Sequence, residues 1–350
     1  MTTSRPWRRL LAIPPRAASF AGLGYAPCDA AVRGRLEKVL ETFVLGYNLA
    51  LEIADPELLA ATLHRQLDAH HVGFAFEGVG MCYALCDLLA PWRPSRLRAF
   101  LEGPGRDHDY IAAVGAGFAL ARLPWGRWLW ASYSRRLDPL IAWCLPDGYG
   151  FHQGIFHPRR YIEGRAAPPA VLPPFARQLF DSGLGRSLWW SQGAEPQRIA
   201  RAIDGFAAAR RPEMWCGIGV AAAYAGGIGD GSAGDTALLA LRDLAGPYRA
   251  DFLSGIPFAT RMRQKGRNPS PVTGRACELL LGLSAEEASD WLVATVERVV
   301  ADDSVEREVR LRDSYLLVRQ RLVEELRNSS QGESPCRVPA HGRQPMIASF

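Results

Sequence analysis

Apolar residues recur every three or four positions along much of this chain, which is the spacing of an amphipathic α-helix. The first clear example runs from Asp29 to Leu51, and Asp29 is a suitable N-cap for it. A second helix is expected to begin at Asp55, with Pro56 in its first turn, and to continue past Leu67. The early part of the chain is therefore expected to be helical.

Three further helices are predicted from long apolar runs that end at Pro91, at Pro124 and at the pair Gly226-Gly227. Each run contains two glycines separated by one residue, at positions 78 and 80, 115 and 117, and 217 and 219. Glycine inside a helix costs about 1 kcal/mol relative to alanine, so the repetition indicates either close approach of helices or room for a ligand. A dinucleotide-binding fingerprint is not indicated, because no strand-like run precedes these glycines.

Strand-like alternation is weak, and a late helix from Ser284 to Val300 has Ser284 and Glu287 at capping-box spacing. The prediction is an all-α, compact helical domain with glycine-rich apolar helices, covering residues 8–327. Two similar halves, 8–165 and 175–327, are an alternative division, with the proline-rich stretch between them as a stiff connector. Residues 328–350 are rich in Ser, Gly, Pro and Gln and are expected to be disordered.

The composition is that of a soluble globular protein, with 48% apolar and 22% charged residues. The net charge of +5 comes almost entirely from arginines that are mixed with acidic residues, so a nucleic-acid surface is not expected. The seven cysteines form no CxxC pair, no signal peptide is visible, and the apolar runs are short for a membrane span. We expect a cytoplasmic protein, with peripheral membrane contact as a weaker alternative.

The stretch from Asp147 to His157 combines glycines, aromatic residues, two imidazoles and a carboxylate within eleven residues. Its glycines are expected to let the backbone turn and come close to a neighbour or a ligand. A carboxylic acid buried among aromatic residues has a raised pKa and can donate a proton, which makes Asp147 and Glu77 catalytic candidates. Asp147 can equally be a turn or cap residue.

His152 and His157 are also catalytic candidates, as acid–base or hydrogen-bonding groups, although a structural role is an alternative. They lie five apart, so a helix would point them to different faces while a loop would let them converge. A metal site would need a third ligand, and the usual metal-ligand spacings are absent from the sequence. Neither a metal nor a cofactor is therefore predicted.

The predicted substrate-binding residues are aromatic or polar groups in the same motifs. Arg186 follows a glycine pair and is expected near a helix start, where it would bind a carboxylate or phosphate, or form a salt bridge to an aspartate. The full set is Tyr149, Phe151, Gln153, Arg186, Trp189 and Trp215.

Several of these motifs resemble the enediyne-cassette family catalogued as domain of unknown function 1702. The resemblance spans residues 8–325, and the tail after Arg327 lies outside it. It rests on the opening RLLAIPPRAASF, on GYNLAL, FEGVGM and HDYIAAVGAGFALARL, and on DGYGFHQGIFH, FDSGLGRSLWW and WCGIGVAAAYAGG.

This resemblance implies a place beside the iterative polyketide synthases that make enediyne natural products, where a linear polyene becomes the enediyne core. Three hypotheses follow for the function. The protein is an enzyme that cyclises or isomerises a polyene or isoprenoid-like chain by protonation, a non-catalytic carrier of such a chain, or a scaffold subunit that binds partner biosynthetic enzymes.

Overall fold

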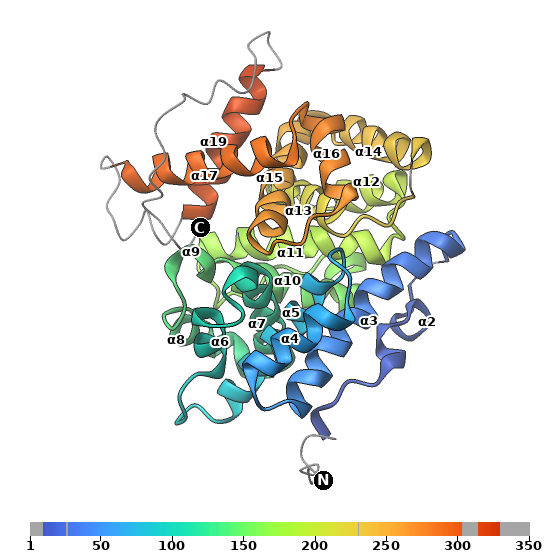
Figure 1. The fold of residues 1–350 in the computed structure, drawn as a ribbon. Helices are drawn as coiled ribbons and strands as arrows, with labels where there is room; N and C mark the ends of the chain where they lie inside the picture. The colour runs from blue at the N-terminus through green and yellow to red at the C-terminus, as the bar shows by residue number, and fades with distance from the viewer. Residues whose placement is uncertain (1–9, 26, 230, 303–313, 330–350) are drawn as a thin grey trace.

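The computed structural model describes residues 10–25, 27–229, 231–302 and 314–329 (Figure 1). Within these ranges all regular structure is helical and no strand occurs. The all-α prediction is confirmed. The expected tail from residue 328 begins with Asn328 and Ser329, which are the last helical residues that the structure describes, and 330–350 lie outside the described residues.

The helices alternate between long buried ones and shorter connecting ones. The long ones are α3 (Ala30–Glu52), α5 (Val72–Leu89), α7 (Asp109–Arg122), α10 (Cys144–Phe156), α11 (Pro174–Ser191), α13 (Arg211–Tyr224), α15 (Arg249–Lys265), α17 (Ala285–Ala301) and α19 (Ser314–Ser329). The shorter ones are η1 (Pro15–Ala18), α2 (Phe20–Leu23), α4 (Pro56–Gln66), α6 (Arg96–Glu102), η2 (Arg106–His108), α8 (Gly126–Ser134), α9 (Pro139–Ala142), η3 (Arg159–Glu163), α12 (Pro196–Asp204), η4 (Ala208–Arg210), α14 (Ser232–Leu244), η5 (Gly246–Tyr248) and α16 (Pro271–Leu281).

The predicted helix caps are present. Asp29 accepts hydrogen bonds from the backbone N–H groups that open α3, and Asp55 does the same for α4. Ser284 and Glu287 form a reciprocal capping box at the start of α17. These local signals set the helix boundaries because each satisfies backbone donors that have no partner inside the helix.

The long helices from α3 to α15 pack side by side in chain order. Neighbours run in the same direction: Phe76 of α5 meets His108, which directly precedes α7, and Gly80 of α5 meets Ala112 of α7. The connecting helices return the chain to the start of the next long helix. In Figure 1 this order runs from the blue and teal helices in the lower part of the view to the orange ones above.

Pairs of glycines let five of the long helices approach both of their neighbours. Residues two apart on an α-helix point about 200° apart, so the two glycines lie on nearly opposite faces. In α5, a Cβ on Gly78 would collide with the backbone of Phe43 in α3, and one on Gly80 would collide with that of Ala112 in α7. Close helix packing is therefore the reason for these glycines.

The same pair of glycines occurs in five consecutive long helices. They lie at 78 and 80 in α5, 115 and 117 in α7, 148 and 150 in α10, 183 and 185 in α11, and 217 and 219 in α13. The repeating unit of long and connecting helices is thus about 35 residues, which is within the range of helical repeat proteins. This repeat is shorter than the proposed halves, whose division stays a prediction.

The array of long helices curves so that its early and late members meet. The Phe74 ring of α5 lies 5.1 Å from the Tyr224 ring of α13. Arg263 of α15 donates a 2.7 Å hydrogen bond to the carbonyl of His70, just before α5. Side chains from α5, α10, α11 and α13 consequently share one interior.

Helix α5 is long and apolar enough to span a membrane, but 89% of that window is buried inside the protein. Its apolar residues pack against α3 and α7 rather than facing outward. This is how the core helix of a compact, soluble helical domain behaves.

Candidate functional site

Three predicted site residues from three different helices form a buried polar cluster. These are Glu77 of α5, Asp147 of α10 and Arg186 of α11. A guanidinium nitrogen of Arg186 lies 2.8 Å from a carboxylate oxygen of Asp147, and the Ser182 hydroxyl donates to the other oxygen at 2.9 Å. The positive charge of Arg186 therefore already has a buried counterion.

Glu77 and Asp147 hold equivalent positions in the repeat, because each directly precedes the first glycine of its pair. Ser182 and Cys216 precede the first glycines of α11 and α13 and are also buried. The equivalent residue of α7 is Val114, which is apolar. The repeat thus places a row of small or acidic side chains in the interior, and the sequence makes only two of them carboxylic acids.

Glu77 is only 4% exposed, and its Oε1 has no hydrogen-bond partner. Burial raises the pKa of Glu77 to about 8; the nearby Arg186 lowers this pKa and Asp147 raises it. Burial also raises the pKa of Asp147, which Arg186 and Ser182 oppose. With Arg186 paired to Asp147, the arrangement leaves Glu77 as a neutral carboxylic acid at pH 7.

Glu77 faces a narrow apolar pocket of about 40 Å³. Every other lining residue is apolar, and one wall comes from the segment before α3. The lining residues are Ile13, Ala17, Ala18, Leu23, Val39, Leu40, Phe43, Val44, Phe74, Glu77, Phe118, Phe151, Ile155, Phe156 and Trp190.

Aromatic rings form a continuous wall along this apolar pocket. The ring of Phe118 lies 5.2 Å from that of Phe43 and 5.3 Å from that of Phe151, which in turn lies 5.1 Å from Trp190. The guanidinium of Arg186 sits 4.4 Å from the Phe151 ring, on which it can stack. The buried ion pair and the aromatic wall are therefore in direct contact.

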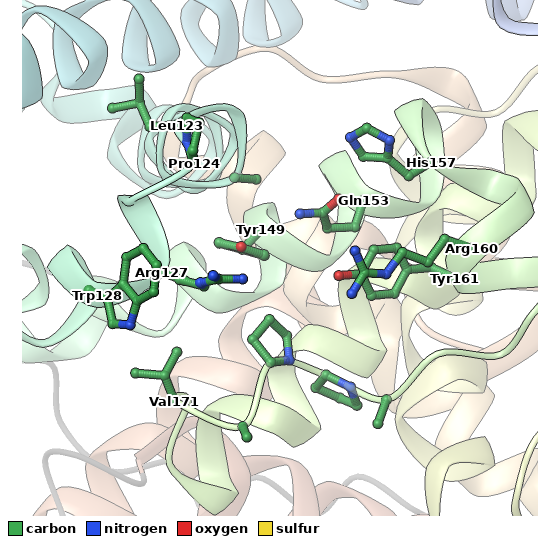
Figure 2. Close-up of a pocket in the computed structure, with 15 residues that line it drawn as sticks. Leu123, Pro124, Arg127, Trp128, Tyr149, Gln153, His157, Arg160, Tyr161 and Val171 are labelled. Carbon is green, nitrogen blue, oxygen red and sulfur yellow. The ribbon is translucent and has the colours of Figure 1, made fainter.

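Three other predicted residues line a separate, wider groove of about 600 Å³ (Figure 2). Tyr149, Gln153 and His157 lie at four-residue spacing on one face of α10 and at its end. Asp147 and Phe151, also four apart, lie on the face that meets Arg186. Because α10 is a helix and not the loop that would have let His152 and His157 converge, the predicted site residues divide between two places.

The family model described as Protein of unknown function (DUF1702) matches residues 3–326. The chain belongs to this family. No curated protein and no solved structure matches it significantly. The family description states no activity, so the site of this DUF1702 protein has to be interpreted from its own residues.

His152 lies outside both pockets of the DUF1702 chain. Its ring is buried between those of Phe118 and Phe156, with centroids 5.4 and 4.7 Å away. Burial lowers the pKa of His152 to about 3, so the imidazole is neutral at pH 7. The ring of His157 is 6.1 Å away.

The two predicted tryptophans are core residues in this DUF1702 protein. The Trp189 indole donates a 2.7 Å hydrogen bond to the carbonyl of Gly226, and Trp215 packs against Phe252 at 6.2 Å. Both are almost completely buried, and neither lines the two pockets described above.

Arg186 lies in the middle of α11, so the expectation that it starts a helix is wrong.

Among the residues that the structure describes, no group of three or more His, Cys, Asp or Glu side chains could hold a metal ion. Sequence analysis did not identify two arginines that line the wider groove and give it positive charge. These are Arg127 and Arg160. Their sequence neighbourhoods carry no motif. The apolar wall supplied by Ile13 and Ala17 was equally hidden, because it depends on how the segment before α3 folds back.

Proposed function

We propose that this protein acts in secondary metabolism, on a polyene or isoprenoid-like chain that it cyclises or isomerises by protonation. The observation that carries the proposal is Glu77, a neutral carboxylic acid at the inner wall of an otherwise apolar pocket. The resemblance to enediyne-cassette proteins supports the same substrate class, since their linear polyene precursor is apolar and conjugated.

The reaction would begin with transfer of the Glu77 proton to one carbon of a C=C bond. The resulting cation is shared along the conjugated chain, and attack by a second C=C bond closes a ring. Loss of a proton from the adjacent carbon to the Glu77 carboxylate then restores both the double bond and the acid. The product is an isomer of the substrate, so atoms and electrons balance without a cofactor.

The surroundings of Glu77 suit both partners of this proton transfer. Arg186 lowers the pKa of Glu77 and therefore stabilises the carboxylate that forms when the proton leaves. The faces of Phe118, Phe151 and Trp190 can stabilise a cation in the pocket. An acid near pKa 8 remains protonated at pH 7 until it meets a substrate.

A polyene needs more room than about 40 Å³, so substrate entry requires the pocket to open. The wall that we propose to move is the segment containing η1 and α2, which contributes lining residues from outside the array of long helices. Its buried Ile13 and Phe20 pack on the core, and side-chain hydrogen bonds also hold it: Asn48 bonds both backbone groups of Ile13, and Glu37 accepts from the N–H of Phe20 at 2.8 Å. The Tyr25 hydroxyl adds a 3.1 Å hydrogen bond to the carbonyl of Ile155. Displacing this segment exposes the pocket without disturbing the glycine contacts between helices.

Binding of diphenylhexatriene, an apolar triene that fluoresces in apolar sites, tests the pocket. Ala17→Phe should block it, because Ala17 lines the pocket, whereas Ala21→Phe should not, because Ala21 is exposed on the same segment. Equal binding by both variants would show that the triene binds elsewhere. Absence of binding to the unaltered protein would remove the substrate class from consideration.

A non-catalytic carrier is the second candidate, because a pocket with a single polar lining residue would also shield a reactive polyene. Glu77→Gln distinguishes the two functions. It should retain triene binding in both cases, but product formation would cease only if Glu77 is the acid. A scaffold subunit instead predicts co-purification with a partner biosynthetic enzyme and no triene binding.

A further inference from the structure

The wider groove on the other face of α10 has a chemistry unlike that of the apolar pocket. It is bounded by the end of α7, by α8, by η3 and by the proline-rich segment 167–171 (Figure 2). Its lining contains two arginines, one histidine, one glutamine and two tyrosines, but no carboxylate. A ligand in this groove would therefore meet hydrogen-bond donors and positive charge.

The two arginines come from opposite sides of the groove. Arg127 belongs to α8 and Arg160 to η3, and both are exposed. The Arg127 guanidinium lies 4.1 Å from the Trp128 ring, and that of Arg160 lies 5.2 Å from the Tyr161 ring. Within the described ranges neither forms an ion pair, so both guanidinium groups can bind an anion. Stacking on a ring leaves the in-plane N–H groups available for this.

The floor of the groove is neutral and polar. Tyr149 and Gln153 are both buried, and they hydrogen bond to each other. Arg127 and Arg160 both act to lower the pKa of the Tyr149 phenol, although burial raises it overall, so both guanidinium groups act on this floor. Their positive potentials therefore add at one place.

The remaining lining is apolar. Pro168 and Pro169 are among the lining residues, and Leu123 and the exposed Trp128 line the groove on the side of α7 and α8 (Figure 2). Proline rings restrict the backbone, so this wall keeps its shape without a ligand. Such a wall contacts a planar or unsaturated body well.

We propose that this groove binds a ligand that carries a terminal oxyanion, a phosphate or a carboxylate, on a planar apolar body. Arg127 and Arg160 donate charge-assisted hydrogen bonds to the oxyanion from their guanidinium N–H groups. Tyr149 and Gln153 contact it from the floor, and the proline wall covers the body. The proposal is independent of Glu77, because the lining residues of the two pockets do not overlap.

Titration with phenyl phosphate, benzoate and neutral benzyl alcohol tests this proposal and distinguishes the two oxyanions. Saturable binding of phenyl phosphate or of benzoate is expected, with much weaker binding of benzyl alcohol. The affinity should fall by about tenfold in Arg127→Gln and in Arg160→Gln, as expected for loss of a charge-assisted hydrogen bond. Binding of only one anion would identify the headgroup.

Arg159→Gln is the matched control, since Arg159 is an exposed neighbour in η3 that does not line the groove. It should bind as the unaltered protein does. The proposal is overturned if neither anion binds saturably, if benzyl alcohol binds as well as the anions, or if the double variant of Arg127 and Arg160 keeps full affinity. Circular dichroism and diphenylhexatriene binding, unchanged in these variants, show that the fold and the apolar pocket persist.

Discussion

Replacing Glu77 with glutamine should make the stability of this protein less dependent on pH. The carboxyl group has a pKa of about 8 in the fold, against 4.5 for the same group in the unfolded chain. Because the folded pKa is the higher one, the stability that this group contributes is fully present below pH 4.5. It declines as pH rises and is lost above pH 8.

The size of this effect follows from the two pKa values. Between pH 4.5 and 8 the unfolded chain is ionised and the folded protein is not, which reduces the free energy of unfolding by about 1.4 kcal/mol per pH unit. From pH 4.5 to pH 7 the loss amounts to about 3 kcal/mol. Glutamine cannot ionise, so Glu77→Gln should gain this amount relative to the unaltered protein over the same interval.

Urea unfolding at several pH values between 5 and 8.5 measures the difference directly. The matched control is Glu41→Gln, an exposed position in α3 that should show a nearly constant difference across this range. Parallel stability curves for Glu77→Gln and the unaltered protein would refute the reasoning, because Glu77 would then be ionised in the folded state.

Two further predictions concern packing and the ion pair. Gly80→Ala should destabilise by several kcal/mol, because its methyl group would collide with the backbone of α7 and overpacking strains a core; Gly34→Ala, in open space on α3, should stabilise by about 0.5–1 kcal/mol. Urea unfolding measures the free energy of unfolding of both variants. Equal effects would contradict the claim that Gly80 is needed for the close contact between α5 and α7. Asp147→Asn should destabilise by about 3–5 kcal/mol at acidic pH, where Glu77 is still protonated and Arg186 is left buried without a carboxylate. Glu77 should then ionise beside Arg186, so the pH dependence assigned to Glu77 should shrink; an unchanged pH dependence would show that the two carboxyl groups do not interact.

Helix positions were predictable because their signals are local. Asp29, Asp55 and Ser284 satisfy backbone donors within a few residues of themselves, so no tertiary information is needed to recognise them. For the stretch from Asp147 to His157 the sequence left a helix and a loop open, because its three glycines are compatible with a turn and with close approach to a neighbour. In the fold two of these glycines, Gly148 and Gly150, contact the helices on either side of α10.

The sequence identified individual site residues but did not show which of them meet in space. Glu77, Asp147 and Arg186 come from three helices whose distance depends on how the array curves. The division of Asp147 and Phe151 from Tyr149 and Gln153 follows from helical phase, and recognising α10 as a helix would have predicted it. The five glycine pairs at about 35-residue spacing are the signal that would have identified both α10 and the repeat.

The most direct test of the central claim is a metabolite profile of a strain in which the gene is deleted and then complemented. Unaltered protein should restore the product. Glu77→Gln, expressed at the same level and still able to bind diphenylhexatriene, should not restore it, and an apolar precursor of the same mass as the cyclised intermediate should accumulate. Full restoration of the product by Glu77→Gln would contradict an acid role for Glu77.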